Sequence, residues 1–146
     1  MKSAIDRIRR LAGLTPRERY LLLYAWWLFL LVDPALRVFP VTALLPRGRP
    51  ARAPGSWPPV DRIAWLVRVA GRHARRRPTC LGEALVLAWT LRRGGRAAVL
   101  RIGVTREGGR LRAHAWLEQG GRVLFGPPAG ETYEPLLSAT TAVGAP

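Results

Sequence analysis

The sequence predicts an α+β fold in which helices precede a small antiparallel sheet. Apolar residues recur at helical spacing as far as Leu91, and the pattern becomes β-rich from Ala97 onward. Paired glycines then separate the β-rich stretches, as in tight hairpin turns. Helices followed by a run of strands are typical of α+β proteins. With 146 residues, the chain has the length of one modest domain.

Residues 1–45 are predicted to form an N-terminal helical segment. Residues 1–14 carry apolar side chains at helical spacing, and the sequence Thr15-Pro16-Arg17-Glu18 has the form of a capping box. Proline also suits the first position of a helix. The helix that begins here is expected to run to Asp33-Pro34.

The apolar run of this helix, 20–32, contains 13 residues, fewer than the ~18–20 that span a bilayer. It also lacks the small-residue cleavage site of a signal peptide. A helix that is apolar all round is typically buried or docked on a partner. Peripheral membrane attachment is the alternative.

Residues 46–59 are rich in Pro, Gly and Arg and predict a linker. Residues 60–138 then form the predicted core. One helix follows the apolar spacing from Val60, and a second begins near Thr79 and Cys80 and stops at Gly94-Gly95.

The predicted sheet is a three-stranded meander over Ala97–Val104, Leu111–Glu118 and Arg122–Phe125. Turns are expected at residues 107–109 and 120–121. The tail, 139–146, has little pattern and is predicted to be flexible.

The charge is strongly positive, with 24 basic residues against 9 acidic and a net charge of +15. The excess is almost all arginine and accompanies abundant Ala, Gly, Pro and Leu, as in proteins of GC-rich bacterial genomes. A functional basic surface for acidic partners or membranes is the alternative reading. The sequence has no recognition motif, zinc spacing or basic–aromatic interleaving that would indicate nucleic-acid binding.

Cys80 is the single cysteine, which excludes an intramolecular disulfide and fits a cytoplasmic protein. With only two histidines, no metal site is expected. Cys80 lies where a helix should begin, directly after three arginines and Pro78-Thr79. The partial positive charge at a helix start stabilises a thiolate, and its amides suit an oxyanion hole. A buried, inert cysteine is the simpler alternative.

His114 follows Cys80 by 34 residues and lies within a predicted strand, between Ala113 and Ala115. Small neighbours leave room for an imidazole to face a helix start. Trp116 is expected to pack in the core, Glu83 to complement the helix dipole, and His73 to be solvated.

The segment Pro78 to Gly126, PTCLGEALVLAWTLRRGGRAAVLRIGVTREGGRLRAHAWLEQGGRVLFG, resembles the transglutaminase-like superfamily and, more closely, the lasso-peptide maturation proteases of the microcin-processing protein family. The resemblance rests on Cys-Leu at a helix start, Leu-Arg-Arg at its end, Ile-Gly-Val, and Ala-His-Ala-Trp-Leu-Glu. It implies a transglutaminase-like or papain-like cysteine protease core, a catalytic helix plus an antiparallel meander.

The resemblance implies Cys80 as nucleophile and His114 as general base and then acid, without a cofactor. The family has an acid on the strand after the histidine, whereas the residues 122–126 here contain no carboxylate or amide. Glu118, on the same strand face as His114 but about 13 Å along it, is the remaining third member. Glu131 could reach the site only through a loop.

By resemblance, the chain removes the leader from a ribosomally made lasso-peptide precursor before a separate cyclase closes the ring. Only helices and a linker precede the catalytic stretch, so a separate recognition protein is expected to present the leader, with an added strand as one mode of presentation. Two alternatives remain: a transglutaminase or acyltransferase that uses the same Cys-His dyad, and a non-catalytic basic binding protein.

Overall fold

The computed structural model describes residues 13–47, 57–126 and 133–140. The helix predicted within 1–14, most of the linker, Glu131 and residues 141–146 lie outside the described residues. The described helices and strands, in chain order, are α2 (Pro16–Val38), α3 (Val41–Leu44), α4 (Val60–Arg72), α5 (Cys80–Arg93), β1 (Val99–Glu107), β2 (Arg110–Gln119), β3 (Arg122–Phe125) and β4 (Glu134–Thr140).

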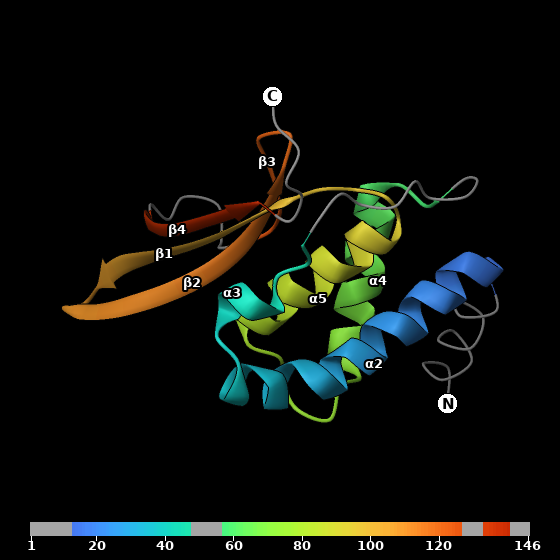
Figure 1. Ribbon diagram of the computed structural model, residues 1–146, viewed down its shortest axis with the longest axis horizontal. Coiled ribbons are helices and arrows are strands. Elements are labelled where there is room, and N and C mark those ends of the chain that lie inside the picture. Colours follow the sequence, from blue (N-terminus) through green and yellow to red (C-terminus); the bar gives the residue numbers. More distant parts are fainter. Residues whose placement is uncertain (1–12, 48–56, 127–132, 141–146) are drawn as a thin grey trace.

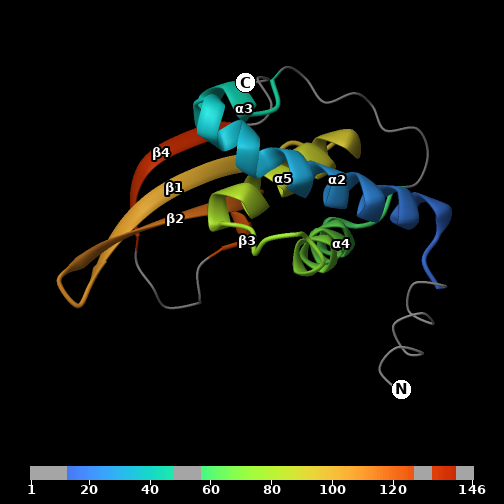
Figure 2. The ribbon, with the colours of Figure 1, turned by 90° about the horizontal axis from the view of Figure 1, so that it is seen from below.

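The strands form one antiparallel sheet in the order β3-β2-β1-β4, with the helices gathered on one side of it (Figures 1 and 2). The predicted α+β architecture is confirmed. The predicted count of three strands is wrong, because β4 returns to pair with β1 at the sheet edge. Its sequence contains Pro135, which is tolerated at an edge but weakens a strand signal. The expected tail boundary at residue 139 therefore falls inside β4.

The two β-hairpin turns are where the paired glycines predicted them. Gly108 and Gly109 have φ of 57° and 78°, and Gly120 and Gly121 have φ of 56° and 76°. Positive φ at both central residues matches the two-residue turns that follow the right-handed twist of a hairpin. The first hairpin aligns β1 and β2 in an uninterrupted register along their whole length.

Helix α5 lies at the centre of the hydrophobic core. It packs against α2 and α4 and covers β2. From β2, Ala115 and Leu117 point into this core, and Leu100 joins them from β1. The core residues on α5 share almost complete burial and are Ala84, Leu85, Val86, Leu87, Ala88 and Leu91.

The predicted capping box of α2 is present. The Glu18 amide donates to the Thr15 hydroxyl at 3.2 Å, and the Thr15 amide donates to the Glu18 carboxylate at 2.7 Å. Arg62 of α4 also binds this carboxylate, at 2.5 Å. The bond from Arg62 is the main reason that the pKa of Glu18 is lowered, followed by the bond from the Thr15 amide. The cap therefore also ties α2 to α4.

Helix α2 does not end at Pro34, as the sequence predicted, but continues to Val38. A proline in a helix removes one backbone hydrogen bond. Packing of α2 on α4 and α5 keeps the remaining turns helical. With 23 residues, α2 is long and apolar enough, by length and composition, to cross a membrane. The whole helix, and not the 13-residue apolar run within it, reaches this length, and the core helix of a soluble protein meets the same criterion.

Candidate active site

Cys80 is the first residue of α5, as the sequence predicted. Thr79 caps the helix, and its hydroxyl accepts a hydrogen bond from the Gly82 amide at 3.1 Å. The thiol is half-buried at the margin of the hydrophobic core. Helix geometry leaves the first amides, those of Cys80 and Leu81, without an acceptor inside the helix. These amides and the helix dipole place partial positive charge beside the thiol.

Two carboxyl groups approach the same end of α5. Glu83 lies one turn after Cys80 and shares its side of the helix. Burial raises the pKa of Glu83, and the charge of Arg68 opposes that rise. Asp33 comes from α2, and its Oδ1 lies 3.9 Å from the position that a β-carbon on Gly82 would occupy. Sequence reasoning missed Asp33, because only the packing of α2 on α5 brings it here.

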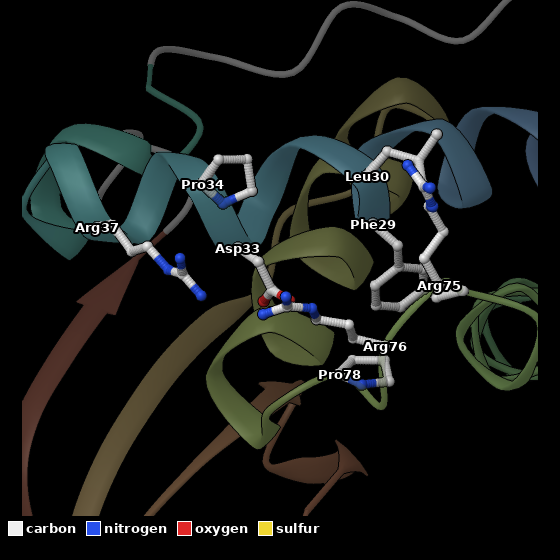
Figure 3. A pocket seen from close by; sticks show the side chains of 9 residues that line it. Phe29, Leu30, Asp33, Pro34, Arg37, Arg75, Arg76 and Pro78 are labelled. Carbon is white, nitrogen blue, oxygen red and sulfur yellow. The ribbon is translucent and has the colours of Figure 1, made fainter.

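A hollow of about 430 Å³ adjoins this helix start, between α2 and the loop that leads to Cys80 (Figure 3). Its lining combines apolar side chains with three arginines and one aspartate: Phe29, Leu30, Asp33, Pro34, Arg37, Ala74, Arg75, Arg76 and Pro78. In Figure 3, the side chains of Arg76 and Asp33 point toward one another.

His114 lies on β2 opposite Gly103 of β1. Successive side chains alternate between the faces of a strand. Ala115 and Leu117 occupy the face that packs on the helices, so His114 and Trp116 lie on the other face. Cys80, in contrast, packs at the margin of the core on the helical side. The structure thus brings α5 and β2 into contact but directs the two predicted catalytic side chains to different faces of β2.

Tyr133 packs against both aromatic side chains on the far face of the sheet. Its ring lies 5.7 Å from that of His114 and 5.9 Å from that of Trp116, centroid to centroid. Trp116 is buried, as the sequence predicted, but on this face rather than in the main core. Sequence reasoning missed Tyr133, which precedes the unpredicted strand β4.

Glu118 shares a face with His114, as predicted, and both of its oxygens accept hydrogen bonds. Trp116 Nε1 donates to one oxygen at 2.8 Å, and Arg101 Nε donates to the other at 2.7 Å. Burial alone would raise the pKa of Glu118. The bonds from Arg101 and Trp116, with the charge of Arg101, outweigh it and lower the pKa. These partners make Glu118 a structural brace of the sheet, and its role as third member of the site stays a prediction.

A family model described as the transglutaminase-like superfamily matches residues 21–138, from the first turns of α2 into β4. This range covers well over half of the chain and contains both Cys80 and His114. The chain belongs to the transglutaminase-like superfamily. Searches of curated proteins and of solved structures found no match.

Membership of the transglutaminase-like superfamily agrees with the observed α+β fold. The matched region also includes most of α2. This superfamily includes cysteine proteases and acyltransferases. The match begins within the segment that the sequence assigned to a separate N-terminal unit. Helix α2, which lies in that segment, supplies Leu21, Ala25 and Phe29 to the common core. The division of the chain into four segments stays a prediction.

His73, the other histidine, lies at the exposed end of α4. Its Nδ1 is 2.8 Å from the carbonyl oxygen of Val69. It is solvated, as expected. Among the described residues, no group of three or more His, Cys, Asp or Glu side chains is arranged to hold a metal ion.

Proposed function

We propose that this chain is a cysteine peptidase that removes the leader from a lasso-peptide precursor. The observation that carries the proposal is the position of Cys80 at the capped start of α5 in a transglutaminase-like chain. A thiol at this position gains from the helix dipole and lies beside amide donors. The resemblance of the segment 78–126 to lasso-peptide maturation proteases gives the substrate class.

The reaction begins with attack of the Cys80 thiolate on the carbonyl carbon of the bond that joins leader and core. The amides of Cys80 and Leu81 are the natural donors to the resulting oxyanion. His114 takes the thiol proton and returns it to the departing amine, which becomes the new terminus of the core peptide. Water then attacks the thioester, releasing the leader carboxylate and restoring the thiol.

The proposal requires the His114 imidazole to come to the helical side of β2. Within the described residues, β3 pairs with β2 only at Leu117–Gln119, so at His114 the strand has a partner on the β1 side alone. Because side chains alternate between the faces of a strand, this change requires the backbone of β2 to turn at His114 as the ring leaves Tyr133, and not a rotation of the ring alone.

The test uses the full chain with a synthetic precursor and its recognition protein. Cys80→Ala is expected to lower the cleavage rate by several orders of magnitude without changing the circular dichroism spectrum. Iodoacetamide should inactivate the wild-type protein, with one alkylation at Cys80. His114→Ala should lose cleavage as well, whereas His73→Ala, the matched control, should cleave normally. Cleavage by Cys80→Ala at the wild-type rate would exclude a cysteine peptidase.

Product mass separates hydrolysis from the acyltransferase alternative. Hydrolysis splits the precursor into two peptides whose masses sum to that of the substrate plus one water. Acyl transfer to an amine joins the leader to that amine, so a labelled amine added to the assay would appear in the product. Cleavage of the precursor without incorporation of the labelled amine would support the peptidase.

The proposed partners are the precursor, a separate leader-recognition protein and a lasso cyclase, in the cytoplasm. The recognition protein would raise the cleavage rate chiefly by raising the effective concentration of the leader near Cys80. Rate measurements with and without that protein test this part. Equal rates would show that the chain reads the leader by itself.

A further inference from the structure

The exposed face of α2 carries an unusual row of large apolar side chains. The outer stripe (Tyr20, Leu23, Trp27, Leu31 and Val38) follows one side of the helix at spacings of three, four and seven residues. Leu23, Trp27 and Leu31 remain 66%, 56% and 48% exposed. The opposite side of the same helix is buried against α4 and α5. The fold therefore uses one side of an apolar helix and leaves the other to solvent.

Among the described residues, the exposed charges of α2 itself are all positive. Arg17 and Arg19 lie at one end of α2 and Arg37 at the other, and all are exposed. The only acidic residues of α2 face inward: Glu18 is bound by Arg62, and Asp33 approaches Gly82 of α5. The stripe thus has an apolar centre and basic ends, without a negative charge from its own helix.

A second basic element lies beside the stripe. The basic loop (residues 72–77) contains Arg72, Arg75, Arg76 and Arg77, all exposed. Trp26 Nε1 of α2 donates a hydrogen bond to the carbonyl of His73 at 3.2 Å, which fixes this loop against the helix. Arg37, Arg75 and Arg76 line one hollow with Leu30, Pro34 and a single carboxylate, that of Asp33 (Figure 3).

We infer that the outer stripe and the basic loop together dock the protein on an anionic phospholipid bilayer. A helix face with exposed Trp and Leu at its centre and arginines at its margins matches an interface of acyl chains and phosphate headgroups. The hollow holds three arginines against the one carboxylate of Asp33, and this excess of positive charge suits a headgroup phosphate, which arginine binds well. The net charge of +15 draws the chain to the same surface. Helix α2 lies flat in this arrangement, because its inner side is part of the core.

This docking is independent of the proposed peptidase activity, but it has a consequence for the site. The basic loop ends three residues before Cys80, so the docked surface lies beside the start of α5. A precursor would then meet Cys80 at the membrane surface.

The test is co-sedimentation of the full chain with vesicles of phosphatidylcholine alone or mixed with phosphatidylglycerol. We expect binding to the mixed vesicles, little binding to phosphatidylcholine, and weaker binding at high salt. Replacing Leu23 and Trp27 by Glu should lower the partition coefficient by at least about tenfold. Replacing Arg75 and Arg76 by Ala should lower it by about twenty-five-fold, since each arginine contributes about fivefold.

The matched control is Leu111→Glu, because Leu111 is 67% exposed and lies beside the turn of the β1–β2 hairpin, which projects away from α2 (Figure 1). This variant should bind vesicles like the wild type, and circular dichroism should show all variants folded. Wild-type protein that stays in the supernatant with anionic vesicles would overturn the inference. If Leu23→Glu and Trp27→Glu instead dissolve a dimer seen by sedimentation velocity, or abolish only the stimulation by the recognition protein, the occupant is a protein and not lipid.

Discussion

Trp116 and Glu118, two residues apart on β2, are joined by a hydrogen bond of 2.8 Å from the indole to the carboxylate. Arg101 of β1 holds the second oxygen of the same carboxylate at 2.7 Å. Glu118 thereby connects the two central strands on the face that carries His114. It fixes the indole that, with Tyr133, forms the surroundings of the imidazole.

Replacing Glu118 by Gln should destabilise the protein by about 1.5–3 kcal/mol, the range for a hydrogen bond to a charged group. Because the pKa of Glu118 is lowered in the fold, its stabilising effect is complete above its ordinary value of 4.5 and is lost as the pH falls through the folded pKa. Urea unfolding of both proteins across the acid range should therefore converge at low pH. If Glu118 only braces the sheet, Glu118→Gln should change kcat little at neutral pH. If Glu118 is the third catalytic residue, the same variant should lose most of its activity.

Thr79→Ala should destabilise the protein by about 1 kcal/mol, since the hydroxyl caps the amide of Gly82. Thr79→Ser keeps the hydroxyl and serves as the control, with near wild-type stability. Under the proposed function, loss of the cap also disturbs the start of α5 and slows alkylation of Cys80 by iodoacetamide. Equal stability of the Ala and Ser variants would contradict the role of the cap.

Gly103→Ala tests the packing of the face opposite the helices. A β-carbon at Gly103 would lie 2.9 Å from both the carbonyl oxygen of Glu134 and the Cη2 atom of Trp116. Neither the backbone of β4 nor a buried indole yields easily, so we expect a loss of about 1–3 kcal/mol in thermal or urea unfolding. Thr105→Ala, two residues along β1, removes atoms instead of adding them and should cost less. A neutral Gly103→Ala would show that β4 can move away from β1.

Leu21 and Leu23 of α2 form a matched pair for the two sides of the helix. Leu21 is fully buried, and Leu21→Ala should cost about 2–5 kcal/mol. Leu23 is exposed, and Leu23→Ala should change stability by less than about 0.5 kcal/mol. Deletion of residues 1–45 should give an aggregating protein, because the core would lose the whole inner side of α2. A soluble, fully active truncation would contradict the packing seen here.

Local chemistry explains the parts of the structure that the sequence predicted well. The hydroxyls of Thr15 and Thr79 each accept a hydrogen bond from one free amide at a helix start, and glycine pairs supply the positive φ of two hairpin turns. These features depend on residues that are neighbours in the chain. The placement of Cys80 at the start of α5 belongs to the same class, and it was the basis for choosing the candidate nucleophile.

The sequence by itself therefore determined the α+β order, the helix starts, the hairpins and the position of Cys80. Only the tertiary structure decided that α2 continues past Pro34, that β4 joins β1, that Asp33 approaches α5, and that His114 lies on the face away from the helices. Each of these depends on contacts between segments far apart in the chain. Tertiary packing decides whether a helix continues past a proline, whether an edge strand forms and which face a side chain occupies. The segments that pack together are far apart in the sequence, so local sequence patterns do not predict these outcomes.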